Sequence, residues 1–147
     1  MRNLFTYPHL LVALQFGLIG LMAYFSRGVL HSTAAMAVFA AGAAFGFWAI
    51  AHNQTGNFHI RPILKDGCRL ITTGPYRLIR HPMYTSVIIM MLGVLISTPT
   101  LLESTLYLAL IAVLYLKARR EERLWCGHNP KYLSYKKRTK LFIPYIL

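Results

Sequence analysis

The sequence predicts an all-α integral membrane protein with about four transmembrane helices. Apolar residues make up 56% of the 147 residues, and they gather in long uncharged runs that an ordinary soluble core does not have. In hydrocarbon a spanning segment has to satisfy its own backbone hydrogen bonds, and the alternating pattern of strands is absent, so we expect helices. A chain of this length predicts one compact domain, residues 1–147.

Four uncharged runs give the expected spans. Two N-terminal helices are predicted within residues 1–52, because Lys, Arg, Asp and Glu are absent between Asn3 and Ser26 and between His31 and Ile60. A hairpin is predicted from Met83 to Thr98 and from Leu101 to Lys117, and only Glu103 interrupts it. Both of its helices are shorter than the roughly 20 residues of a full crossing, so we expect them nearer one membrane face.

The start of the chain also allows a secretory signal peptide, since Met1 and Arg2 precede an apolar run. That run is too long and has no convincing cleavage site of small residues. We therefore expect the first helix to remain in the membrane.

Basic residues predict the topology. Of the 16 Lys and Arg residues, only Arg27 lies in the loop between the first two helices. The positive-inside rule then predicts that both termini and the segment before the third helix lie on the cytoplasmic side. The membrane itself is expected to be an inner or cytoplasmic membrane. This topology and attraction to anionic membrane lipids explain the net charge of +12, so no nucleic-acid partner is expected. Tyrosines in the basic tail could stack on bases, but interfacial anchoring is the more typical role.

Cysteine and histidine patterns predict no metal site. Cys68 and Cys126 are the two cysteines, and their spacing fits neither a metal site nor a redox pair, so both are expected to be free thiols. The six histidines include no HExxH motif.

The second helix carries a small-residue motif and a polar end. Gly42 and Gly46 form a GxxxG step that predicts close helix packing. At or just beyond its cytoplasmic end, Trp48, His52, Asn53 and Gln54 either anchor at the interface or line a site, and the sequence leaves both interpretations open.

The segment from Thr72 to Ser86 combines turn-forming, basic and aromatic residues directly before the third helix. Gly74-Pro75 predicts a tight turn, and Pro82 predicts the helix start because a residue before proline avoids the α region. Free N–H groups at this helix start, beside Arg80 and His81, are expected to favour a carboxylate or phosphate. The alternative is a juxtamembrane loop whose arginines contact lipid phosphates.

Several motifs from Ile60 to Leu147 resemble those of the isoprenylcysteine carboxyl methyltransferase family and the related phospholipid methyltransferases. In order they are Gly74-Pro75-Tyr76-Arg77, Arg80-His81-Pro82-Met83-Tyr84, the helical hairpin, Glu121-Glu122, Tyr132-x-x-Tyr135 and Leu141-Phe142-Ile143-Pro144. The stretch from Tyr132 to Lys140 also reads as a short basic amphipathic helix on the membrane surface.

The resemblance implies an S-adenosylmethionine-dependent methyltransferase with a cytosolic active site in residues 60–147. Its lipophilic acceptor would enter from the bilayer, as an isoprenylcysteine-like carboxylate or another amphiphilic small molecule. The alternatives are a phospholipid or amine N-methyltransferase, a sterol-reductase-like NADPH enzyme, and a non-catalytic membrane subunit.

The resemblance also implies roles for individual residues. The cofactor-binding set is Tyr76, Arg80, His81, Pro82, Tyr84 and Glu122, and the catalytic set is Glu121, Glu122, Tyr135 and His128. The paired acids would receive the cofactor's ammonium group or orient a neighbouring arginine, whereas the alternative is salt bridging with Arg119, Arg120 or Arg123.

One departure concerns the methyl acceptor. The family often has Arg followed by Phe-Gly in the turn after the acids, whereas this chain has Cys126-Gly127-His128-Asn129-Pro130. His128 or Arg123 would then take the place of that arginine, or the acceptor differs.

Overall fold

The fold is an array of helices, seen in a computed structural model that describes residues 8–53 and 70–144. The described part contains five α-helices and no strand. The elements are α1 (Pro8–Phe25), the short 3₁₀ helix η2 (Val29–His31), α2 (Thr33–His52), the 3₁₀ helix η4 (Gly74–Arg77), α3 (Pro82–Ser97), α4 (Leu101–His128) and α5 (Lys131–Arg138). The prediction of an all-α fold is confirmed for these residues.

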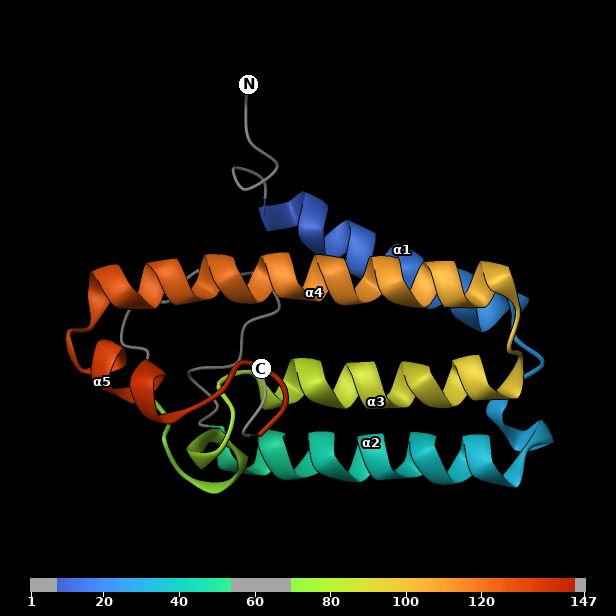
Figure 1. The fold of residues 1–147 in the computed structure, drawn as a ribbon, viewed down its shortest axis with the longest axis horizontal. Helices are drawn as coiled ribbons and strands as arrows, with labels where there is room; N and C mark the ends of the chain where they lie inside the picture. Colours follow the sequence, from blue (N-terminus) through green and yellow to red (C-terminus); the bar gives the residue numbers. More distant parts are fainter. Residues whose placement is uncertain (1–7, 54–69, 145–147) are drawn as a thin grey trace.

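The long helices lie in layers, in the order α2, α3, α4 and α1 (Figure 1). α2 packs along α3, and α1 crosses α4 at an angle and also contacts α3 (Figure 1). The α1–α2 and α3–α4 connections lie at one end of the array, whereas η4, the start of α3 and α5 lie at the other (Figure 1). The motif-bearing segments are therefore gathered at a single end.

Two helices, α2 and α4, are long and apolar enough to cross a membrane, and α1 and α3 are apolar but shorter. Large apolar side chains such as Phe47 of α2 and Leu108 of α4 are exposed on the outside of the array, as expected for contact with lipid. α3 matches the predicted span from Met83 to Thr98 closely. The prediction for α4 is too short, because the helix continues from Lys117 to His128 and carries both acids on regular helical turns.

Small residues allow α2 and α3 to touch closely, as the GxxxG step predicts. A Cβ atom on Gly42 would lie 2.7 Å from the backbone nitrogen of Met90, and one on Gly46 would collide with the Ser86 side chain. The Ser86 hydroxyl uses this proximity to donate a 2.8 Å hydrogen bond to the Gly42 carbonyl.

The predicted turn and helix start are also found. Gly74 has a φ of 56°, a left-handed conformation that glycine adopts without strain, and a Cβ there would collide with the His52 ring. α3 begins at Pro82. The expected cluster of free N–H donors is not formed, because the Tyr84 and Thr85 amides both donate to the His81 carbonyl at 3.1 Å and Pro82 has no N–H.

The chain after α5 runs beside the segment before α3. The Arg80 amide donates to the Lys140 carbonyl at 2.8 Å, and the His81 amide donates to the Leu141 carbonyl at 3.2 Å. The predicted helix from Tyr132 to Lys140 corresponds to α5, which starts one residue earlier and ends at Arg138. These contacts place the two sequence motifs side by side.

Candidate functional site

A cavity of about 150 Å³ lies at the end of the array where the motifs meet. Its lining comes from the end of α2, residues 70–84, α4 and α5: Asn53, Leu70, Ile71, Tyr76, Arg80, His81, Pro82, Met83, Tyr84, Glu121, Trp125, Tyr132 and Tyr135.

Most of the predicted site residues line this cavity. Five of the six predicted cofactor residues do so, and Glu121 and Tyr135 of the predicted catalytic set join them. Glu122 lies on α4 but is not part of the lining, and His128 is exposed at the end of that helix. The structure therefore does not bring His128 into the cavity.

Glu122 is the centre of a buried ionic cluster. The Arg80 Nε donates to its carboxylate, the Lys136 Nζ lies 2.9 Å from Oε2, and the Arg119 guanidinium lies 3.7 Å away. The Glu122 side chain is 2% exposed and that of Arg80 is 9% exposed. A buried carboxylate requires such partners, since an uncompensated buried charge is very costly.

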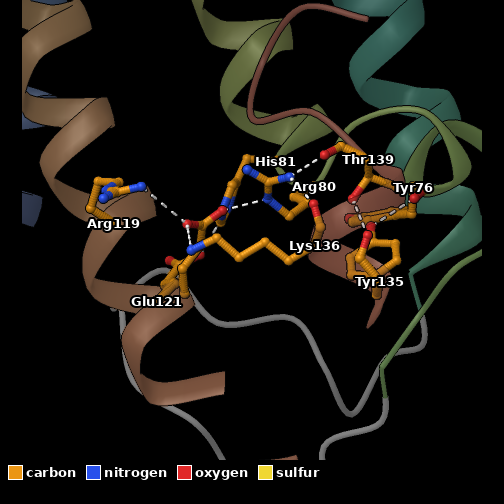
Figure 2. A network of polar contacts seen from close by, with 9 residues as sticks. Tyr76, Arg80, His81, Arg119, Glu121, Tyr135, Lys136 and Thr139 are labelled. Carbon is orange, nitrogen blue, oxygen red and sulfur yellow. Dashed lines mark hydrogen bonds and ion pairs between the residues drawn. The ribbon is translucent and has the colours of Figure 1, made fainter. Parts of the chain in front are cut away.

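Arg80 also connects the segment before α3 to the chain around α5 through hydrogen bonds. The Arg80 Nη1 donates to the Lys136 carbonyl at 3.1 Å and to the Thr139 carbonyl. Figure 2 shows Arg80 between Lys136 and Thr139, with Arg119 approaching from α4. Of the roles considered for the paired acids, orienting a neighbouring arginine fits Glu122, and salt bridging with Arg119 is also present.

Glu121 has different surroundings from Glu122. Its Oε1 accepts a hydrogen bond from the Tyr84 hydroxyl, and its Oε2 lies 3.3 Å from the His81 Nδ1. The His81 and Tyr84 rings stack with centroids 5.4 Å apart and planes 7° apart. The Glu121 side chain is 21% exposed and faces the cavity.

His81 retains a buried nitrogen without a protein partner. Its Nε2 makes no hydrogen bond to the described residues, although His81 lines the cavity. Buried polar atoms normally have partners, so an unsatisfied one in a cavity wall indicates where a polar ligand atom can bind.

Tyrosines form much of the remaining wall. Burial, with a smaller contribution from Glu121, raises the pKa of Tyr76 to about 12, and burial also raises the pKa of Tyr132 and of Tyr135. All three therefore stay neutral at physiological pH. The Tyr135 hydroxyl donates to the Tyr76 carbonyl at 2.6 Å, as Figure 2 shows. Trp125 stacks on Tyr132 with centroids 5.8 Å apart.

Sequence reasoning missed Lys117 and Gln15. Lys117 was taken as the end of a span, but its side chain is buried, donates to the Gln15 amide oxygen and lies 5.1 Å from the Tyr84 ring centroid. Its position one helical turn before Glu121 is the signal that could have placed it near the site. Asn53, which was left between two interpretations, lines the cavity.

The described residues contain neither a candidate metal site nor a disulfide. Within residues 8–53 and 70–144, no group of three His, Cys, Asp or Glu side chains could hold a metal ion. Cys126 is half-buried and forms no disulfide there. Cys68 lies outside the described residues, as does Gln54 just beyond the end of α2.

Comparisons with known proteins identify two related sequences that each match about half of the chain. The chain is 33% identical over 76 residues to the cobalt-zinc-cadmium resistance protein CzcN of Cupriavidus metallidurans, which is 51% of this chain and 35% of that protein. It is 30% identical over 81 residues to the nickel-cobalt-cadmium resistance protein NccN of Alcaligenes xylosoxydans xylosoxydans, which is 54% of this chain and 38% of that protein. The match thus spans little more than a third of either relative's length. No solved structure matches the chain.

A family model described as phospholipid methyltransferase matches residues 30–127, about two thirds of the chain. The matched region contains α2, α3, nearly all of α4 and most of the cavity wall. It confirms the kinship inferred from the motifs. This chain therefore belongs to the phospholipid methyltransferase family.

Proposed function

We propose that this protein transfers a methyl group from S-adenosylmethionine to a lipophilic acceptor that reaches the cavity from the bilayer. One observation carries the proposal: the Arg-His-Pro-x-Tyr loop and Glu121 of α4 meet around one cavity in a member of this family. The proposal covers residues 1–147 as a single domain, with residues 60–147 as the cofactor-binding core and residues 1–52 as two membrane helices.

The cavity chemistry fits part of such a cofactor. The Glu121 carboxylate can accept an ammonium group, the His81 Nε2 can bond a polar ligand atom, and the aromatic walls favour a sulfonium by cation–π attraction. Pockets that enclose drug-sized ligands have volumes of roughly 300–1,000 Å³, so a nucleoside ligand would fill this cavity and extend beyond it.

The arrangement supports Glu121 rather than Glu122 as the residue that contacts the cofactor. Glu122 is already compensated by Arg80, Lys136 and Arg119. We assign Glu122 and Arg80 to holding the loop, and Glu121, His81, Pro82, Tyr76 and Tyr84 to the cofactor. Tyr135 supports Tyr76 through its backbone hydrogen bond.

S-adenosylmethionine supplies an already activated methyl group, so the protein needs little covalent chemistry of its own. Its residues would align the acceptor with the methyl group and exclude water, and positioning of this kind can lower a barrier by about 7–11 kcal/mol. Apolar lining residues such as Leu70, Ile71 and Met83 are suited to excluding water and contacting a lipid chain.

The acceptor can belong to either of two classes. An isoprenylcysteine-like carboxylate is already ionised and needs no base, whereas a phospholipid amine has to lose a proton before it attacks. The family match supports a lipid-related acceptor and is compatible with the amine.

The membrane arrangement is part of the proposal. α2 and α4 would cross the bilayer fully, while α1 and α3, at about 27 and 24 Å by their residue counts, would cross with local thinning. The cavity and both termini would face the cytoplasm of an inner or cytoplasmic membrane, following the basic residues.

Calorimetric titration of the detergent-solubilised protein with S-adenosylmethionine tests the proposal, with NADPH as the comparison ligand. We expect saturable binding of S-adenosylmethionine alone, and loss of it in His81→Gln. Binding of NADPH alone would indicate a reductase. Binding of neither, in protein with a normal thermal unfolding transition, would indicate a non-catalytic subunit.

A second assay separates the acceptors. Methyl-labelled S-adenosylmethionine is incubated with vesicles that contain either phosphatidylethanolamine or a farnesylcysteine derivative. Label in the amine lipid alone would assign an N-methyltransferase, and label in the thioether carboxylate alone would assign an O-methyltransferase.

A further inference from the structure

Lys117 is a buried cation in the middle of the helix array. Lys117 is 1% exposed. Its side chain extends from α4 and contacts residues of α1 and α3 rather than solvent. Burying an ionisable side chain within a membrane helix is costly, and residues that persist there usually serve a site. Its surroundings therefore indicate what that site is.

Two contacts and one electrostatic attraction connect Lys117 to the cavity wall and to α1. Its ammonium group donates to the Gln15 side chain on α1 and lies 5.1 Å from the centroid of the Tyr84 ring on α3. It also attracts Glu121, which lies one turn further along α4. Lys117 itself does not line the cavity, whereas Tyr84 and Glu121 do.

We propose that Lys117, held in place by Gln15, is a positioning residue that fixes the orientation of Tyr84 and Glu121 in the cavity wall. α1 thereby becomes a part of the site, although it lies outside the region that the family model matches. The assignment of a ligand to this wall rests on the proposed function, while the positioning of the wall itself does not.

The physical basis of this positioning role is that each oxygen of the Glu121 carboxylate has its own partner. One oxygen accepts from the Tyr84 hydroxyl and the other lies beside the His81 Nδ1. A cation beneath the Tyr84 ring attracts both that ring and the carboxylate, and so holds them in one arrangement. Without it, Glu121 can turn away from His81, and the His81 ring loses the partner that fixes its proton on Nδ1.

The alternative is that Lys117 and Gln15 only fasten α1 to α4. Two variants separate these roles. Lys117→Met leaves the Gln15 side chain without its buried partner, which destabilises the fold under either interpretation. Gln15→Leu/Lys117→Met replaces both partners by apolar side chains of similar size, and this kind of paired replacement can be nearly neutral for stability.

A matched control comes from the other end of α4. Glu103 is a fully buried acid in the first turn of that helix, far from the cavity. Glu103→Gln changes a buried carboxyl group in the same helix without touching the cavity wall.

The first measurement uses protein without ligand. Nitrogen-15 NMR resolves the two ring nitrogens of His81, whose signals are assigned by their absence in His81→Gln. We expect the wild type and Glu103→Gln to share a protonated Nδ1 signal, and we expect its loss in Lys117→Met and in the double variant. An unchanged His81 signal in the double variant would overturn the proposal.

The second measurement is the affinity for S-adenosylmethionine. We expect roughly tenfold weaker binding by the double variant even where its thermal unfolding matches that of the wild type, comparable to the lower end of the 10–100-fold loss that follows when outer-shell partners of metal ligands are removed. Wild-type affinity together with wild-type stability in the double variant would reduce Lys117 to a fastening role.

The two proposals fail in different ways. Should the wild type bind no S-adenosylmethionine while the His81 signal still depends on Lys117, the proposed function fails and the positioning role stands. Should the wild type bind the cofactor while both measurements are indifferent to Lys117, only the positioning role fails.

Discussion

Glu121 and Glu122 are neighbours in the sequence, but they belong to different parts of the structure. Successive residues of a helix point about 100° apart, so one acid faces the cavity and the other faces the α5 segment. Glu122 is 2% exposed and is surrounded by three cations, whereas Glu121 is 21% exposed and is contacted by a phenol and an imidazole. An acid paired with three cations away from the cavity holds structure together, and an acid that faces the cavity remains available to a ligand.

The largest effect is expected from removing a buried partner of Glu122. Arg80→Met removes the main partner of a buried carboxylate and two hydrogen bonds to the chain around α5. We expect a loss of about 3–5 kcal/mol in the free energy of unfolding, because the buried carboxylate loses its most buried cationic partner and two backbone carbonyls lose a charged donor. Thermal and chemical unfolding of the solubilised protein measures this. A loss below 1 kcal/mol would contradict the structural role of the pair.

Glu121→Gln tests the other acid. The amide keeps the shape and can still accept from Tyr84, so we expect little change in stability. The affinity for S-adenosylmethionine should fall by about 10–100-fold, since a hydrogen bond to a charged group contributes about 1.5–3 kcal/mol. Calorimetric titration measures the change. Unaltered affinity combined with reduced stability would reverse the roles assigned to the two acids.

Tyr135→Phe removes one hydrogen bond between two residues that line the cavity. The phenol donates to the Tyr76 carbonyl, and the substitution leaves that partly buried carbonyl without this donor. We expect a destabilisation of about 1–2 kcal/mol, with a smaller effect on cofactor affinity than that of Glu121→Gln. Parallel unfolding and binding curves for the two variants provide the test. A larger affinity loss in Tyr135→Phe would indicate direct ligand contact by the phenol.

Arg119→Ala is expected to have the smallest effect. Arg119 also contacts Glu122, but its side chain is 45% exposed and the separation is 3.7 Å. Exposed pairs of this kind contribute about 0.2–1 kcal/mol, and added salt weakens them. Unfolding at low and high salt measures the contribution, with Arg80→Met as the buried counterpart. Equal losses in the two variants would show that burial does not separate these arginines.

The sequence predicted helix starts and close contacts wherever a residue type limits the backbone. Pro82 defines the start of α3, Gly74 occupies the left-handed turn, and Gly42 and Gly46 lie where α2 and α3 touch. Each outcome depends on the covalent structure of one residue or on the absence of a side chain, so it could be read without knowing the fold.

The length of α4 could not be predicted in the same way. Hydropathy marks where an apolar run ends, and the run ends at Lys117. The helix continues because Glu122 and Lys117 find buried partners on other segments, and those partners offset the cost of their charges. The prediction of free N–H groups at the start of α3 was wrong for a local reason, because two of these groups donate hydrogen bonds to the His81 carbonyl.

By itself, the sequence determined the helical class, the order of the motifs and most of the residues that line the cavity. These features depend on composition, on long uncharged runs and on short motifs that resemble those of a known family. Only the tertiary structure decided that Glu122 pairs with Arg80, that Glu121 faces the cavity, that His128 lies outside it and that Lys117 connects the wall to α1. The two members of each pairing come from segments tens of residues apart, so their meeting depends on how whole helices pack.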